Sequence, residues 1–399
     1  MSTVEFVRFS FETLGYPPAR VPVLPRMTLG DFFRMSRGKR IVDRRADCGF
    51  FVRARYALFH VLTELGVGED DCVLVPAYHC RTMIEPVVRS GAKPLFYKVN
   101  TDLSADIEHV EAMIARCQGR ISCLLLPHYF GFPQPMERIV PLLERHGVIL
   151  IEDCAHVLFD RSEPDGPGSF GDYSIYSPSK FLPCPDGGLL RVRRRETLKP
   201  TLLRPHRLLA EARIFVRLLA LAVRGQSTAP VRPMHRESSD DSRSGNENLC
   251  QRRTIDTQSL AVGRSDFYDP SMENLRGSLW SVRILDTADF ADISAARKRN
   301  FCWWLEAVSG LPGCRPLFTK LTNDVTPYMF PLILEHPARH FDVLKRLGMP
   351  IYRWDELAVS ECARSAFFRL HLLQLPCHQG LAEEELQWML EVLRSCLAQ

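Results

Sequence analysis

The region between residues 46 and 200 alternates short apolar runs with amphipathic segments, and this alternation limits the folds that the chain can adopt. Strand-like apolar runs occur at 73–75, 94–97, 121–126 and 148–151. Between these runs, apolar residues recur every three or four positions, the period of a helix that buries one face. Strands that alternate with helices predict the α/β fold class with a largely parallel sheet. In such sheets, ligands bind at the carboxyl ends of the strands.

The chain has 399 residues, enough for more than one domain, and its character changes along its length. The first residues contain several Pro and Arg and show little periodicity. A polar stretch at 226–263 has too few large apolar residues to offset the entropy of ordering, which predicts a flexible insert. Helices at 206–224, 284–308, 339–347 and 382–397, with a strand at 328–334, are predicted beyond the large domain. The expected domains are an N-terminal arm (1–45), a large domain (46–205), a helix with a flexible polar insert (206–270) and a smaller C-terminal α/β domain (271–399).

The overall composition argues against several classes of protein. Lys and Arg total 51 against 47 acidic residues, and the net charge of +4 is spread along the chain, so no nucleic-acid partner is predicted. The 13 cysteines are scattered without the spacing of a metal site, which favours free thiols in a reducing cytoplasm and no bound metal. The N-terminal segment includes Glu5 and Glu12 and lacks a long apolar core, so neither a secretory signal nor a membrane span is expected.

Asp153 and Lys180 are the most informative pair of polar residues. Asp153 follows the apolar run at 148–151, and Lys180 comes 27 residues later, shortly before Gly187-Gly188. Pyridoxal phosphate (PLP) requires a lysine that forms an imine with its aldehyde and a carboxylate that keeps its pyridine nitrogen protonated. Alone, Asp153 could be an ordinary helix N-cap and Lys180 a solvated surface lysine. Together, in this order, they predict a PLP site in which Lys180 bonds the cofactor and moves a proton.

The phosphate of the cofactor requires hydroxyl, backbone and cationic partners. Ser177 precedes Lys180 by three residues and can offer a hydroxyl, although an ordinary turn serine is the alternative. A helix is predicted to begin at Ala54, and backbone N–H groups at a helix start bind anions. Arg55 can add a bidentate contact, or it can be a surface arginine. His128 follows another strand-like run, where it lies near the site or is satisfied by backbone groups.

The residues from about 51 to 192 resemble the DegT/StrS-type family of fold-type-I PLP enzymes, which are best known as nucleotide-sugar aminotransferases. A weaker likeness continues through Arg297-Lys298-Arg299-Asn300-Phe301 and Leu375-Pro376, so about two-thirds of the chain is covered. The shared motifs are Val75-Pro76-Ala77-Tyr78-His79-Cys80, Ser90-Gly91-Ala92-Lys93-Pro94, His128-Tyr129-Phe130-Gly131, Ile151-Glu152-Asp153-Cys154-Ala155-His156, Gly171-Asp172 and Ser177-Pro178-Ser179-Lys180.

The resemblance implies a role for each predicted site residue. Lys180 is the imine lysine, Asp153 is the partner of the pyridine nitrogen, and His156 lies on the side of the phenolic oxygen of the ring. The members of the phosphate site are Ser177, Ala54 and Arg55.

Further expectations follow from the same resemblance. Cys80 stands where an aromatic residue of the family stacks on the cofactor ring, a role that His79 or Tyr78 could take instead. The family is usually homodimeric, with an asparagine of the partner chain at the phosphate, and Asn274 is the candidate for that asparagine. The chain departs from the family where Arg53-Ala54-Arg55 replaces a Ser-Gly-Thr helix start.

The resemblance therefore implies a fold-type-I PLP-dependent aminotransferase with a large domain and a smaller C-terminal α/β domain. The enzyme would transfer an amino group from glutamate or another amino acid to a nucleotide-linked keto sugar, in polysaccharide or secondary-metabolite biosynthesis. One alternative is a PLP enzyme that acts on a non-sugar carbonyl, because the polar stretch at 226–263 displaces a segment that binds the sugar nucleotide in the family. Another is a non-catalytic member with a binding or regulatory role.

Overall fold

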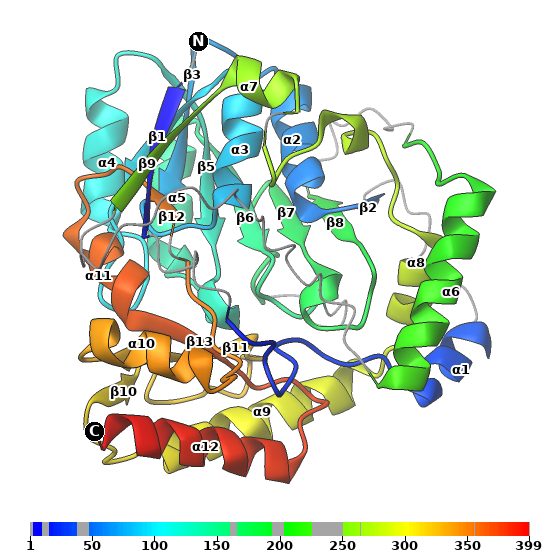
Figure 1. The fold of residues 1–399 in the computed structure, drawn as a ribbon. Helices are drawn as coiled ribbons and strands as arrows, with labels where there is room; N and C mark the ends of the chain where they lie inside the picture. Colours follow the sequence, from blue (N-terminus) through cyan, green and yellow to red (C-terminus); the bar gives the residue numbers. More distant parts are fainter. Residues whose placement is uncertain are drawn as a thin grey trace, which may run out of the picture.

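The computed structural model describes residues 3–9, 16–37, 48–159, 166–193, 203–225, 250–263, 265–354 and 356–398. A seven-stranded sheet is the centre of the large part of the fold, with strand order β2-β8-β7-β6-β5-β3-β4 (Figure 1). Strands β3 to β7 are parallel to one another, and β8 is antiparallel to both β7 and β2. The strands are β2 (Cys48–Phe51), β3 (Asp71–Pro76), β4 (Lys93–Tyr97), β5 (Arg120–Pro127), β6 (Ile149–Cys154), β7 (Tyr173–Tyr176) and β8 (Gly188–Val192).

Helices cover both faces of this sheet because successive buried residues of a strand point to opposite sides. On one face, Ile151 of β6 joins a core with α2 (Ala54–Glu64) and α3 (Arg81–Arg89). On the other face, Leu150 joins a core with α4 (Ile107–Arg116) and α5 (Met136–His146). The mostly parallel α/β architecture is as the sequence predicted. The short 3₁₀ turns η2 (Tyr129–Gly131) and η3 (Pro178–Lys180) follow β5 and β7.

Two smaller sheets complete the fold. The first has the order β12-β1-β9 and consists of β1 (Thr3–Phe9), β9 (Cys250–Asp256) and β12 (Glu356–Ala358). The second belongs to the C-terminal part and consists of β10 (Cys314–Pro316), β11 (Met329–Leu334) and β13 (Leu372–Pro376). Around it lie α9 (Phe290–Ala307), α10 (Pro337–Arg346), α11 (Ala363–His371) and α12 (Glu383–Leu397).

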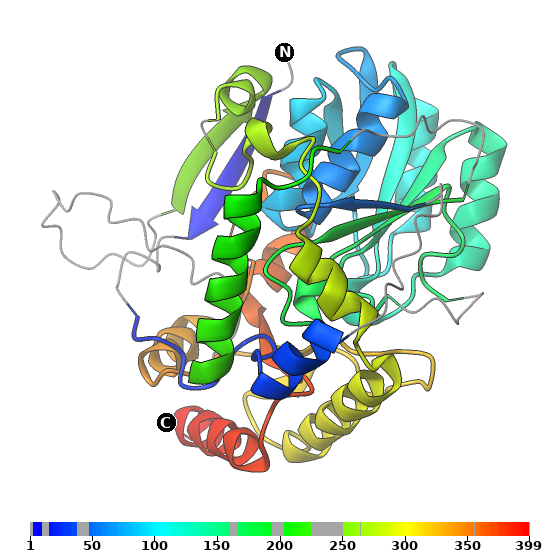
Figure 2. The same ribbon diagram turned by 90° about the vertical axis from the view of Figure 1, so that its right-hand side faces the viewer.

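Three further helices, α1 (Leu29–Arg37), α6 (Leu208–Arg224) and α8 (Leu279–Asp286), pack side by side at one flank of the molecule (Figure 2). Their shared interior is aromatic. Phe215 of α6 lies 5.2 Å from Phe32 of α1 and 4.7 Å from Trp280 of α8, measured between ring centroids. Among the described residues, no helix is long and apolar enough to cross a membrane.

Two expectations about secondary structure are wrong. The helix expected over 284–308 is broken into α8 and α9, because Asp289 caps the backbone N–H of Asp292 and starts a new helix. Residues 250–261, which lie in the expected flexible insert, form β9 and α7 (Thr257–Ala261), because β9 pairs along its whole length with β1. Residues 226–249 of that insert lie outside the described residues. The division of the chain into four domains stays a prediction.

Candidate active site

A cavity lies at the carboxyl ends of β5, β6 and β7, beside the first turn of α2. This is the edge of the sheet where ligands of parallel α/β folds bind. Asn274 is an exposed residue that does not line the cavity, so its expected role from a partner chain stays a prediction. The predicted residues that line the cavity are Lys180, Asp153, His156, Ser177, Ala54, Arg55 and Cys80.

Asp153 is the second-last residue of β6 and presents a buried carboxylate to the cavity. Its Oδ1 accepts one hydrogen bond, 2.9 Å long, from the backbone N–H of Ala155. Burial raises the pKa of Asp153, and the positive charge of Lys180 partly opposes that rise. A buried carboxylate of this kind gains most from a cationic partner, which is what a protonated pyridine nitrogen offers.

Lys180 ends the 3₁₀ turn that follows β7, and its ammonium faces the same cavity. Burial lowers the pKa of Lys180, while the nearby Cys80 and Asp153 act in the opposite direction. Its Nζ lies 5.3 Å from the ring centroid of Tyr328, at the start of β11. A lysine whose pKa is lowered is neutral for more of the time and is therefore a better nucleophile and base.

His156 lies between the large and small parts of the fold. Its Nδ1 accepts a hydrogen bond of 3.1 Å from the backbone N–H of Phe130, and burial lowers its pKa well below the ordinary value. The ring is therefore neutral with its proton on Nε2, which remains able to donate. Tyr328 stacks on this ring at a centroid distance of 4.4 Å. Tyr328 belongs to no sequence motif that pointed to the site.

The first turn of α2 has the features of an anion site. Arg53 precedes the helix without a side-chain cap, so its side chain leaves the N–H groups of the first turn open. Gly188 holds this turn against β8, since a Cβ at Gly188 would lie 2.3 Å from the backbone nitrogen of Ala54. Arg53, Arg55 and Ser177 line the cavity here. A dianionic phosphate fits this set of backbone, hydroxyl and guanidinium donors.

Cys80 lines the cavity, but His79 and Tyr78, the alternatives for the expected stacking role, do not. The ring of His79 stacks on Phe96, and its Nε2 accepts a hydrogen bond from the backbone of Ala358. Tyr78 is fully buried behind the cavity wall. The aromatic residues that do line the cavity are Tyr129 and Trp354. Trp354 comes from the C-terminal part of the chain, where no sequence signal pointed to the site.

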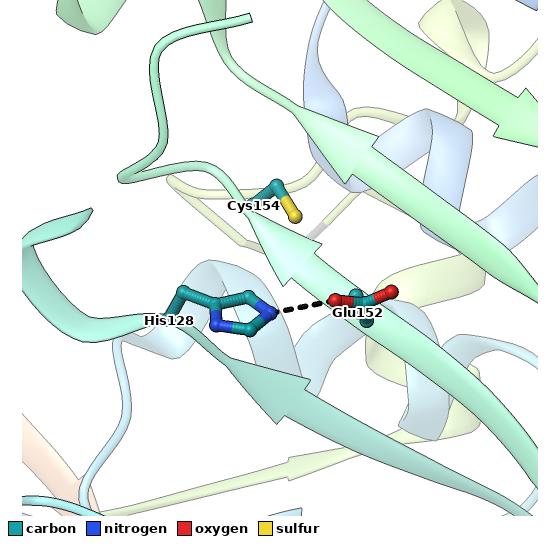
Figure 3. Close-up of side chains that lie close together, drawn as sticks. All are labelled: His128, Glu152 and Cys154. Carbon is teal, nitrogen blue, oxygen red and sulfur yellow. Dashed lines mark hydrogen bonds and ion pairs between the residues drawn. The ribbon is translucent and has the colours of Figure 1, made fainter. Parts of the chain in front are cut away.

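His128, Glu152 and Cys154 gather on the face of β6 opposite to Asp153 (Figure 3). His128 Nε2 donates to Glu152 Oε2 over 2.8 Å, and His128 Nδ1 accepts from the backbone N–H of Gln134. The Glu152 carboxylate also accepts hydrogen bonds from three backbone N–H groups, those of Gly168, Phe170 and Gly171. Burial alone would raise the pKa of Glu152, but His128 and these N–H groups outweigh it and lower the pKa.

The two predictions for His128, a place near the site and satisfaction by hydrogen bonds, are both met in part. Both of its ring nitrogens are occupied, one by a carboxylate and one by a backbone group, and the residue also borders the cavity. Since the Glu152 carboxylate already accepts four hydrogen bonds, a metal ion at this cluster would have to displace them. The cluster is better suited to fastening the 168–171 loop to β5 and β6.

The chain was compared with known proteins. Residues 53–206 match the family described as the DegT/DnrJ/EryC1/StrS aminotransferase family. A UDP-N-acetyl-3-dehydro-α-D-glucosamine 3-aminotransferase from Acidithiobacillus ferrooxidans is 36% identical over 138 residues, 34% of this chain and 37% of that protein. A GDP-perosamine synthase from Vibrio cholerae is 26% identical over 167 residues, 39% of this chain and 45% of that protein. The chain thus spans less than half the length of these two relatives.

The similarity of the fold extends over nearly the whole chain. A protein from Streptococcus pneumoniae, assigned as a sugar aminotransferase and solved in its PLP form, superposes with a TM-score of 0.63. The match covers 96% of this chain and 98% of that one at 14% identity, so it concerns the fold alone. The expected fold-type-I architecture is confirmed. Residues 53–206, less than half of the chain, are thus similar to the DegT/DnrJ/EryC1/StrS aminotransferase family, whose members use PLP.

Proposed function

We propose that this chain is a PLP-dependent aminotransferase that transfers an amino group from an amino acid to a nucleotide-linked keto sugar. The observation that carries the proposal is one cavity that holds a lysine, a buried carboxylate and the first turn of a helix. These three groups match the aldehyde, the ring nitrogen and the phosphate of PLP. Lys180, Asp153 and the segment Ala54–Arg55 would hold the cofactor at these three points.

The protein groups have distinct tasks in such a reaction. Bound PLP supplies an electron sink that stabilises negative charge on the substrate carbon next to the amino group. Asp153 holds the ring nitrogen protonated, because a buried carboxylate without a cation is unfavourable. His156 would hold the phenolic side of the ring through a hydrogen bond donated by its Nε2–H group. Ser177, Arg55 and the N–H groups of α2 hold the phosphate.

Lys180 would bond the cofactor covalently and then carry the proton. Its lowered pKa favours the free amine, and Lys180 lines the same cavity as Asp153 and Cys80. As a neutral amine, Lys180 would serve as the base that holds and moves the proton at the cavity. Tyr328 lies against the lysine and restricts the volume in which its amine moves.

The keto-sugar acceptor is proposed from the relatives. Both curated proteins described above are named for nucleotide-linked sugars, UDP in one and GDP in the other. Purified protein would be incubated with glutamate and either a nucleotide keto-sugar or a simple keto acid. Amination of the keto-sugar alone supports the proposal, whereas amination of the keto acid alone favours a non-sugar carbonyl substrate.

The catalytic assignment has a direct test. Purified protein incubated with PLP should show the visible absorption of covalently bound cofactor, and K180A should lose it. Lys93→Ala is a matched control, because Lys93 is an exposed lysine on β4. If K180A keeps the absorption band, or if the band is absent from the wild type, the assignment of Lys180 is wrong.

We also propose a homodimer in the cytoplasm. Leu209, Val216 and Val223 of α6 are 74, 63 and 68% exposed, and their spacing of seven places them on one stripe of the helix. Phe33 on the neighbouring α1 is 59% exposed. Apolar patches of this kind mark association surfaces. Sedimentation velocity should show a dimer for the wild type and dissociation for V216D. A monomeric wild type would contradict the proposal.

The cytoplasmic location is supported by the cysteines. Eleven cysteines of the described ranges are free thiols, and most of these are buried. Such thiols persist in a reducing compartment. Fractionation of cells that express the tagged full chain should recover it with the cytoplasmic fraction, and recovery in an oxidising compartment would contradict this location.

A further inference from the structure

Arg297, on α9 of the C-terminal part, is a fully buried guanidinium that the proposed reaction does not use. Among the described residues, no carboxylate forms an ion pair with it. Burial lowers its pKa to about 10. A buried charge without a counter-ion is unfavourable unless hydrogen bonds satisfy it, so the partners of Arg297 indicate what its position serves.

The partners of Arg297 come from three separate segments of the chain. Its Nη1 donates to the carbonyls of Pro327 and Tyr328 over 3.2 and 2.9 Å, and its Nε donates to Gln379 Oε1 over 3.0 Å. Its Nη2 donates to the backbone carbonyl of Lys180 over 3.2 Å. The planar guanidinium offers donors in fixed directions, which lets one side chain hold several carbonyls in a set arrangement.

The turn that carries Lys180 is held in part by the hydrogen bond from Arg297, which belongs to another segment of the chain. The backbone N–H groups of Lys180 and Phe181 bond within the turn, to the carbonyls of Ser177 and Pro178. The carbonyls of Lys180 and Phe181 are instead held from the C-terminal part, by Arg297 and by Gln379, whose Nε2 donates to Phe181 over 2.7 Å. The Arg297 guanidinium also lies 4.5 Å from the ring centroid of Phe181.

The same guanidinium holds the residue that lies against the lysine amine. Arg297 binds the carbonyl of Tyr328, and the ring of Tyr328 lies 5.3 Å from Lys180 Nζ and stacks on His156. One side chain therefore fixes both the backbone that carries the amine and the ring beside it. A displacement of about 1 Å at a reacting group can reduce a rate by roughly a hundredfold.

We propose that Arg297 is a positioning residue for Lys180, through which the C-terminal part of the fold sets the place of the amine in the cavity. This inference rests on the proposed role of Lys180. It predicts that loss of Arg297 or Gln379 shifts the Lys180 turn and weakens the covalent capture of PLP in a protein that still folds.

The test uses the full chain in three variants. R297K keeps the charge but loses the fork of donors, and Q379A removes a half-buried partner that touches both Arg297 and Phe181. R353K is the matched control, because Arg353 is also buried, lies 3.6 Å from the ring centroid of Phe341 and donates to the carbonyl of Leu370. Circular dichroism first establishes that each variant folds.

Two readouts follow. PLP is titrated into each cofactor-free variant to obtain a dissociation constant, and hydrogen exchange is measured at the amides of 178–182 without PLP. We expect R297K to raise the dissociation constant and the exchange rate by about tenfold, Q379A to do so by less, and R353K to stay within about twofold of the wild type. The inference would be overturned if R297K and Q379A kept the wild-type dissociation constant and exchange rate. It would also be overturned if all three variants changed these two quantities equally. Absence of PLP capture by the wild type refutes the proposed function itself, and the exchange readout then still decides whether Arg297 holds the turn.

Discussion

Replacement of Glu152 by alanine should cause a large loss of stability that can be worked out from the structure. Glu152 is fully buried and accepts four hydrogen bonds, one from His128 and three from the backbone N–H groups of the 168–171 loop. In E152A these four donors lose their acceptor together. Each buried donor without a partner costs about 1–3 kcal/mol.

The lower end of that range is the better guide, because water that enters the vacated space can satisfy part of the loss. We therefore expect E152A to lower the free energy of unfolding by about 4 kcal/mol. Urea unfolding followed by far-ultraviolet circular dichroism measures this difference. Glu306→Ala is the control, since Glu306 is exposed on α9 and its loss should change the free energy by less than about 0.5 kcal/mol.

A loss of less than about 1 kcal/mol in E152A would refute the reasoning. It would mean that the loop is held by its own turns, or that the carboxylate does not accept the four hydrogen bonds at the same time. A loss near 4 kcal/mol, with the E306A control unchanged, would establish that this single carboxylate fastens the segment between β6 and β7.

Two more predictions concern other parts of the fold. G188A should lower the free energy of unfolding by about 3 kcal/mol and weaken PLP binding, because its Cβ would meet the backbone of Ala54 at 2.3 Å. G147A, whose Cβ would meet nothing within 4 Å, should cost only the strain of its φ of +65°, about 1 kcal/mol, and leave PLP binding unchanged. Asp71 has a pKa lowered to about 2, chiefly by a hydrogen bond from Arg120. The ionised carboxylate therefore stabilises the folded state fully at neutral pH, and this contribution is lost as the pH falls from about 4 towards 2. The difference in urea midpoint between wild type and D71N should therefore shrink over that pH window, and a constant difference would contradict the assignment.

The periodic parts of the fold, and the meeting of Asp153 and Lys180 at one cavity, were predictable from local sequence. Alternating apolar runs indicated the parallel sheet, because each strand and helix carries its own period. This meeting was predictable because Asp153 lies near the carboxyl end of β6 and Lys180 follows β7, and the carboxyl ends of parallel strands meet at one edge. The helix break before Asp289 was missed because the apolar spacing continues through α8 and α9. The break is marked only by the side chain of Asp289, which caps the start of α9.

The sequence by itself determined the α/β class and predicted that Lys180 and Asp153 share a site, and both residues line one cavity. Tertiary structure alone decided how that lysine is held: Arg297 lies 117 positions away along the chain and reaches Lys180 only when the C-terminal part has packed. Tertiary structure also decided that Tyr328 lies against the Lys180 amine and that Glu152 binds the backbone of the 168–171 loop. The physical reason is that periodicity reports which face of an element is buried, whereas the partner of a buried polar group depends on which distant segments the folded core brings together.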